Sequence, residues 1–202
     1  MIKNKTLPII AIILTILVLA VIAFYVYVQY FQKHYVEIYS EENNDRVEFL
    51  ILKPDQLSAE RFAKFELALS TLQDKPYDRT SLLNLGQHYL EAEEYKEAEK
   101  AYEQHLKVDP YEPDVLLGLG RTRVKMKEYK KAEENFYQIT EVFPLYMQAY
   151  KELLKLYQQE DLKPNEKFVD ELRAALEIAE QDIYKQEIEE LIQAYRLATV
   201  NK

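Results

Sequence analysis

The stretch EYKEAE at residues 94–99 returns as EYKKAE at residues 128–133, with five of six residues unchanged at an offset of 34. Three prolines share this spacing, namely Pro76, Pro110 and Pro144. A period of this length, with Ala- and Leu-rich segments between the prolines, predicts a stack of repeated helix pairs. The matching positions are Leu82 with Leu116, Leu85 with Leu119, Gly86 with Gly120, Ala98 with Ala132, and Tyr102 with Phe136.

The amino-acid composition also favours helices over strands. The 202 residues include only 3 glycines and no cysteine or tryptophan, which is unusual for a β-fold built on tight turns. Without cysteine the chain has no disulfide, no thiolate nucleophile and no cysteine-ligated zinc site. The formal net charge of −9 at pH 7 disfavours general nucleic-acid binding, because phosphate contacts require a concentrated positive surface. We therefore predict an all-α protein that does not bind nucleic acid.

The repeated pattern resembles the tetratricopeptide repeat (TPR), in which a bulky residue, Leu-Gly and Tyr are followed by Ala, an aromatic residue and a closing Pro. The second copy departs from it at Arg123, where the first has Tyr89, and a third copy carries Leu154 in place of the glycine. The resemblance implies a short TPR-like α-solenoid with capping helices. The first copy matches at Leu82, Leu85, Gly86, Tyr89, Ala98, Tyr102 and Pro110.

Packing requirements explain why these positions recur. Gly86 and Ala98 would let the two helices of one unit approach closely, and Tyr102 would fill the space between neighbouring units. A proline such as Pro110 stops a helix. One unit cannot bury its apolar face alone, so units stack. An ordinary helical bundle with coincidental similarity is the alternative, and the shared phase of the Pro, Leu-Gly, Ala and aromatic positions argues against it.

An apolar segment precedes the repeats. Residues 7–28 read LPIIAIILTILVLAVIAFYVYV, an uncharged run of 22 residues whose helical length of ~30 Å matches the hydrocarbon core of a bilayer. A cleaved signal peptide is the alternative, with Lys3 and Lys5 as its basic region and Val21-Ile22-Ala23 as its cleavage site. The run is longer than a usual signal-peptide core, which favours an uncleaved transmembrane anchor at 7–29 that contacts the lipid bilayer.

Basic residues around the anchor predict its orientation. Lys3 and Lys5 precede it, whereas Lys33 is the only Lys or Arg within about 15 residues after it. The positive-inside rule then places the N-terminus in the cytoplasm and the repeats on the extracytoplasmic side, in a bacterial inner membrane. The reverse orientation would make the chain a cytosol-facing receptor.

The segment between the anchor and the repeats carries two apolar patterns. Apolar and aromatic residues recur there at helical spacing and predict that the membrane helix continues into solvent, namely Phe24, Val28, Phe31, Tyr35 and Ile38. The run VEFLIL at 47–52 is either a short strand or an apolar patch on the repeat domain. The predicted units are a cytoplasmic tail at 1–6, the anchor at 7–29, a juxtamembrane connector at 30–57 and a TPR-like domain at 58–202, with a leading helix at 58–75, repeats at 79–112 and 113–146, a degenerate repeat at 147–181 and a closing helix at 183–199.

No set of residues in the sequence points to catalysis. The three histidines, His34, His88 and His105, lack the close helical spacing of metal sites. The Gly-x-Gly at Gly118 and Gly120 lies within a predicted helix without a preceding strand, unlike a phosphate-binding loop. We expect no catalytic residues, no metal and no cofactor, and an enzyme would need a polar cluster that forms only on folding.

By resemblance to the family, the first helix of each unit lines a concave groove that binds peptides or protein surfaces. The expected groove has a strip of leucines bordered by basic side chains, which suits an amphipathic helix or an extended segment with acidic residues. Its predicted residues are Leu83, Gln87, Leu90, Leu117, Arg121, Val124, Lys125, Lys151 and Lys155.

Cytosolic co-chaperones of this family hold a C-terminal carboxylate with Lys and Asn side chains, and this set is missing here. The corresponding positions hold Leu83, Gln87, Gly118, Gln148 and Glu152. The sequence thus predicts a membrane-anchored TPR adaptor or scaffold that binds a protein or peptide partner. A membrane-tethered chaperone or holdase for translocated polypeptides is the second hypothesis.

Overall fold

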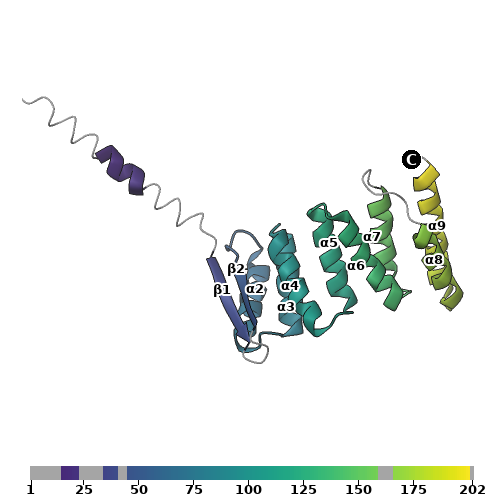
Figure 1. Cartoon of the computed structure of the whole chain (residues 1–202), viewed down its shortest axis with the longest axis horizontal. Helices are drawn as coiled ribbons and strands as arrows, with labels where there is room; N and C mark the ends of the chain where they lie inside the picture. Colours follow the sequence, from purple (N-terminus) through teal and green to yellow (C-terminus); the bar gives the residue numbers. More distant parts are fainter. Residues whose placement is uncertain (1–14, 23–33, 41–44, 159–165, 201–202) are drawn as a thin grey trace, which may run out of the picture.

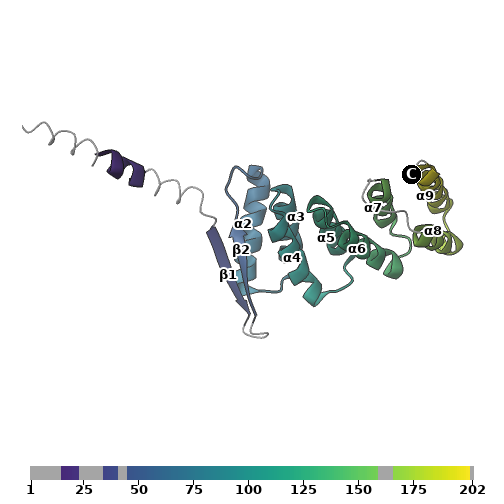
Figure 2. The ribbon, with the colours of Figure 1, turned by 45° about the horizontal axis from the view of Figure 1, so that its top comes forward.

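The structure is a computed structural model, and it describes residues 15–22, 34–40, 45–158 and 166–200 (Figure 1). Figures 1 and 2 show a two-stranded hairpin followed by a row of antiparallel helices that ends at the C-terminus. The elements are β1 (His34–Ser40), β2 (Asp45–Ile51), α2 (Ala59–Asp74), α3 (Arg79–Glu91), α4 (Tyr95–Val108), α5 (Pro113–Lys125), α6 (Tyr129–Val142), α7 (Met147–Gln158), α8 (Glu166–Ile178) and α9 (Asp182–Val200).

The helix pairs α3–α4 and α5–α6 carry the repeated sequence. Asp78 begins the first pair, because its side chain accepts a hydrogen bond of 2.8 Å from the backbone N–H of Ser81. Pro113 begins the second pair in the first turn of α5, where its missing N–H leaves no bond unmade. Glu93 and Lys127 occupy equivalent positions in the two turns, and both adopt a φ of 61°. The two copies therefore share the same turn geometry as well as the same sequence pattern.

Glycines and aromatic rings hold the pairs together. A Cβ built on Gly86 would lie 2.4 Å from Cε1 of Tyr102, and one built on Gly120 would lie 2.3 Å from Cε1 of Phe136. Tyr102 and Phe136 are both almost fully buried. The rings of α4 and α6 thus lie directly on the helix backbones of α3 and α5, at distances that only glycine permits.

Replacing Gly86 by alanine is expected to destabilise the protein by about 1–2 kcal/mol. The methyl group would displace the Tyr102 ring, and this overpacking outweighs the gain in helix propensity. Chemical denaturation followed by circular dichroism measures the change. Ala63→Gly, at an exposed position of α2, is the control for the effect of helix propensity alone. If Gly86→Ala stabilised the protein by as much as Ala63→Gly destabilised it, the packing argument would be contradicted.

Arg123 stands where the first copy has Tyr89, and its side chain forms a polar network. Its guanidinium donates to Glu99 at 3.0 Å, to the Asn135 side-chain oxygen at 2.8 Å and to Glu103 at 2.9 Å. Its side chain is only 14% exposed. The arginine therefore links α5 to both α4 and α6, whereas Tyr89 in the first copy packs its ring against Phe65 of α2 and donates its hydroxyl to the carbonyl of Leu50.

Replacing Arg123 by glutamine is expected to lower the free energy of unfolding by about 1.5–3 kcal/mol, because charge-assisted hydrogen bonds at a largely buried site are lost. Chemical denaturation measures the change. Lys130→Gln makes the same change of charge at an exposed position of α6 and should cost less than about 0.5 kcal/mol. Similar losses for both variants would show that net charge, not the network, is responsible.

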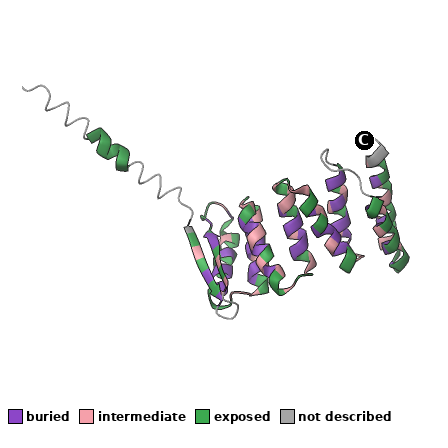
Figure 3. Ribbon diagram, in the orientation of Figure 1, coloured by how far each residue is buried: buried purple, intermediate pink, exposed green. Residues whose placement is uncertain are grey.

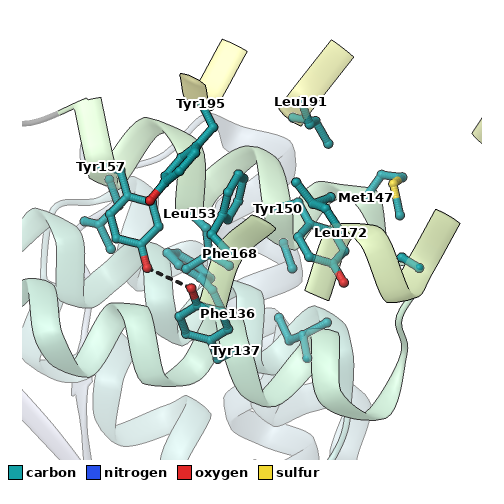
Figure 4. Packing of buried hydrophobic residues seen from close by; sticks show 14 of the residues in the cluster. Phe136, Tyr137, Met147, Tyr150, Leu153, Tyr157, Phe168, Leu172, Leu191 and Tyr195 are labelled. Atoms are coloured by element: carbon teal, nitrogen blue, oxygen red, sulfur yellow. Dashed lines mark hydrogen bonds between the residues drawn. The ribbon is translucent and has the colours of Figure 1, made fainter. Parts of the chain in front are cut away.

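The C-terminal helices close the stack through a cluster of aromatic rings (Figure 4). Phe168 of α8 is fully buried, with ring centroids 6.1 Å from Tyr150, 5.7 Å from Tyr157 and 4.7 Å from Tyr195. The hydroxyl groups of Tyr137 and Tyr157 lie 2.9 Å apart and link α6 to α7. Helix α9 packs along both α7 and α8. In the degenerate third unit, which lacks the glycine, this aromatic cluster holds the helices together.

The structure corrects the sequence analysis before the first helix of the repeats. The helical spacing through Tyr35 and Ile38 predicted a continuing helix, and this is wrong, because residues 34–40 form strand β1. β1 pairs antiparallel with β2, from His34 opposite Ile51 to Ser40 opposite Asp45. The prediction of an α-solenoid is confirmed for the helices that follow, but the fold is not wholly α because this hairpin precedes them.

The hairpin is part of the hydrophobic core. Tyr89 donates a hydrogen bond of 2.5 Å to the backbone carbonyl of Leu50, and Lys100 donates one of 2.9 Å to that of Glu48. Lys107 pairs with Asp45 at 2.7 Å. Much of the predicted connector at 30–57 therefore covers the N-terminal end of the stack, and it buries Ile38, Phe49, Leu50, Leu52 and Leu57.

The predicted anchor lies mostly outside the described residues. Of the segment 7–29, only residues 15–22 are described, and they form a short helix whose side chains are all exposed (Figure 3). Across the described parts of the chain, no helix is both long enough and apolar enough to cross a membrane.

Candidate functional site

Helices α3, α5 and α7 define one face of the stack, since α3 contacts α5 and α5 contacts α7. A depression with a volume of about 970 Å³, its open side included, lies on this face between α2 and α5. Four helices contribute to it. The lining residues are Arg61 from α2, Gln87, Leu90 and Glu91 from α3, Tyr102 from α4, and Asp114, Leu117, Gly118 and Arg121 from α5. We refer to this depression as the groove.

The floor of the groove is apolar. Leu90 is half-buried and packs against the N-terminal core, and Leu117 is buried in the C-terminal core. Gly118 has no side chain, so the Tyr102 ring that packs against its backbone reaches the groove. Apolar side chains beside bare backbone suit the close approach of a peptide main chain.

Three of the four charged lining residues, Arg61, Glu91 and Arg121, are ion-paired within the protein, and the fourth, Asp114, accepts a hydrogen bond of 2.6 Å from the hydroxyl of Tyr146. Arg61 pairs with Glu91, and Arg121 donates to Glu152 at 3.0 and 2.7 Å. Burial opposes the charge on Glu152, but the hydrogen bonds and charge of Arg121 outweigh burial and hold the pKa of Glu152 below its ordinary value. The groove therefore presents little net charge to a ligand.

The structure brings together four of the nine predicted groove residues, namely Gln87, Leu90, Leu117 and Arg121. Leu83 and Val124 pack against the two cores, and Lys125 is exposed outside the groove. Lys151 pairs with Glu187 at 2.5 Å, and Lys155 lies 3.3 Å from Glu152. The basic border expected from the sequence is thus largely compensated by acidic partners.

Five lining residues lie outside the set predicted from the sequence, namely Arg61, Glu91, Tyr102, Asp114 and Gly118. Arg61 comes from the leading helix α2, outside the repeated units, and no periodic signal pointed to it. Tyr102 was assigned to packing alone. The signal for a second role was available, because the equivalent position of the second copy is Phe136, which lacks a hydroxyl.

The described residues contain no group of three His, Asp or Glu side chains that could hold a metal ion. His88 of α3 and His105 of α4 are buried, and their Nδ1 atoms have no hydrogen-bond partner. Burial lowers the pKa of both imidazoles below their ordinary value. They are neutral packing residues at neutral pH.

Acidification from about pH 7 to pH 5 is expected to destabilise the protein through His88 and His105. Their pKa values are lower in the folded state than the ordinary value of about 6.5, so the unfolded chain binds more protons and stability falls as the pH drops. Thermal unfolding measured across this range should show the decline. The double variant His88→Gln and His105→Gln should flatten the slope, and an unchanged slope would assign it to other groups.

Two family models, both described as tetratricopeptide repeat, match residues 58–113 and 89–157. No curated protein sequence matches the chain significantly. A tetratricopeptide repeat protein from Parabacteroides merdae is similar in structure, with a TM-score of 0.54, 16% identity, and coverage of 70% of this chain and 57% of that one. The crystal structure of MamA gives 0.50 and 17%, covering 67% and 82%.

At these identities the structural likeness concerns the fold alone. The family models match the same residues that form the helix pairs, the glycine–aromatic contacts and the groove. Residues 58–157 therefore form tetratricopeptide repeats, the family that both models describe.

Proposed function

We propose that the protein is a membrane-anchored TPR adaptor that binds an extended segment of a partner protein in its groove, at the extracytoplasmic face of a bacterial membrane. The observation that carries the binding role is the groove itself. The consecutive helices α3, α4 and α5 place Leu90, the Tyr102 ring and Leu117 around one depression, on the face lined by the first helices of the pairs. TPR stacks offer such faces as extended binding surfaces.

The anchor and its orientation are supported by sequence. The uncharged run at 7–28 has the length of a membrane span, and Lys3 and Lys5 precede it. The chain contains no cysteine, so a single cysteine introduced at Thr6 or Lys130 would be the only site in the chain that a maleimide labels. A membrane-impermeant maleimide applied to intact spheroplasts should label Lys130→Cys but not Thr6→Cys. The opposite pattern would indicate a cytosol-facing receptor.

Photocrosslinking in cells tests the groove. A photoreactive amino acid at Gln87, which is exposed in the groove, should give adducts with one dominant protein. Leu67 of α2 is 67% exposed and lies outside the groove, so the same amino acid there is the control. Leu90→Lys adds an unpaired charge to the apolar floor and should abolish the Gln87 adduct. Equal adducts at both positions, or adducts that survive Leu90→Lys, would overturn binding in the groove.

A membrane-tethered holdase is the second candidate, and one observation favours it. The floor of the groove is apolar and three of the four charged lining residues are ion-paired within the protein, which suits many unrelated apolar segments. The same crosslinking experiment separates the two functions. Many unrelated adducts at Gln87, all lost with Leu90→Lys, would favour the holdase over the dedicated adaptor.

A further inference from the structure

The hydroxyl group of Tyr102 is the least expected polar group of the groove. The side chain is 1% exposed, yet it lines the groove. A Cβ built on Gly118 would lie 2.7 Å from the hydroxyl oxygen and 2.6 Å from Cζ. Any larger residue at position 118 would therefore cover this oxygen, and glycine leaves it open to the groove.

Three other deeply buried tyrosines use their hydroxyl groups within the protein, whereas that of Tyr150, outside the groove, has no partner among the described residues. Tyr89 donates to the carbonyl of Leu50, and Tyr137 and Tyr157 bond to each other. Within the described parts of the chain, the Tyr102 hydroxyl has no such partner. Buried polar groups are nearly always hydrogen-bonded, so an open hydroxyl on an apolar floor points to a partner outside the chain.

The second copy of the repeat has no equivalent feature. Phe136 stands where Tyr102 stands, and Glu152 occupies the position that corresponds to Gly118. There the side chain of Glu152 takes the place of bare backbone, and it pairs with Arg121. A phenylalanine thus satisfies the packing at this position, and packing alone does not require the hydroxyl of Tyr102.

The chemistry of the ligand follows from the charges around this hydroxyl. The charged lining residues are two basic and two acidic, Arg61 and Arg121 with Glu91 and Asp114, so the groove is complementary to a segment without net charge. Leu90 and Leu117 offer an apolar surface next to the hydroxyl.

We propose that the Tyr102 hydroxyl binds the main chain of the partner segment. The occupant is an extended, uncharged peptide segment with an apolar side chain against Leu90 and Leu117. One of its backbone carbonyls accepts a hydrogen bond from Tyr102 over the bare backbone of Gly118. This inference rests on the proposed function of the groove, and it makes Tyr102 a recognition residue that does not depend on the ligand's sequence.

Peptides selected from a phage-displayed library of random peptides against the full-length protein in detergent micelles provide the probe. Binding of the recovered peptides is measured by fluorescence anisotropy. Tyr102→Phe should weaken binding about three- to tenfold, the value of one hydrogen bond, and should leave the thermal midpoint nearly unchanged. Tyr150→Phe is the matched control, because Tyr150 is equally buried and lies outside the groove. It should leave affinity unchanged.

The outcomes separate this inference from the function on which it rests. Suppose that Leu90→Lys abolishes peptide binding but Tyr102→Phe binds the peptides as tightly as the unmodified protein does. This result would overturn the role of the hydroxyl and would leave binding in the groove supported. Peptides unaffected by Leu90→Lys, or no recovered peptides, would overturn groove binding and the role of Tyr102 together. Recovered peptides rich in acidic or basic residues would overturn the neutral occupant.

Discussion

Replacing Phe168 by alanine is expected to lower the free energy of unfolding by about 3–5 kcal/mol. The ring is fully buried and contacts three tyrosines from α7 and α9, so its removal leaves a cavity that rigid helices cannot close. Chemical denaturation followed by circular dichroism measures the loss. Because α8 and α9 depend on this ring, we also expect hydrogen exchange to increase in both helices before it increases in α3 and α4.

Ile178→Ala is the control for this variant. Ile178 lies in the same helix and is 53% exposed, so its truncation should cost less than about 0.5 kcal/mol. If the two variants were equally stable, the aromatic cluster would not be what holds the C-terminal helices. Faster exchange throughout the chain would instead show that the whole stack unfolds as one unit.

Replacing Phe49 by alanine is expected to cost about 3–5 kcal/mol as well, although Phe49 lies outside the repeats. Its side chain is 1% exposed and belongs to the same core as Phe65, Leu85 and Tyr89. Loss of helical signal at lower denaturant concentration is the measurement. The result would show that the hairpin and the first helix pair unfold cooperatively.

Ile51→Ala serves as its control, since Ile51 is in the same strand and 43% exposed. Its truncation should cost well under half as much as that of Phe49. An unchanged helical transition in Phe49→Ala, with loss of the hairpin alone, would mean that β1 and β2 are an appendage. The segment would then act only as the connector predicted from the sequence.

The repeats could be predicted from the sequence because their geometry is local and periodic. The spacing of 34 between Gly86 and Gly120, and between Tyr102 and Phe136, reports a contact that recurs in each unit. The hairpin gave no such signal. Tyr35 and Ile38 fit a helical period by coincidence, whereas the core uses the alternation of Val36 and Ile38 with exposed Glu37.

The groove could be predicted only in part, for a related reason. Family resemblance indicated which helix faces line it, and Leu90 and Leu117 follow from that. Charge pairing depends on side chains about 30 residues apart, such as Arg121 with Glu152 and Arg61 with Glu91, and no sequence pattern showed these pairs. The sequence therefore suggested a basic groove, and the folded chain has a neutral one.

The hairpin also determines how the domain responds to mechanical force. A pull through the residues that precede His34 acts on the start of β1, where His34 faces Ile51, the last residue of β2. Load at this end separates the strands one residue pair at a time, the geometry in which an antiparallel ladder resists least. β2 remains fastened to the helices through Leu50 and Glu48. Tension would therefore peel away β1 first, and the helix pairs with the groove would keep their shape.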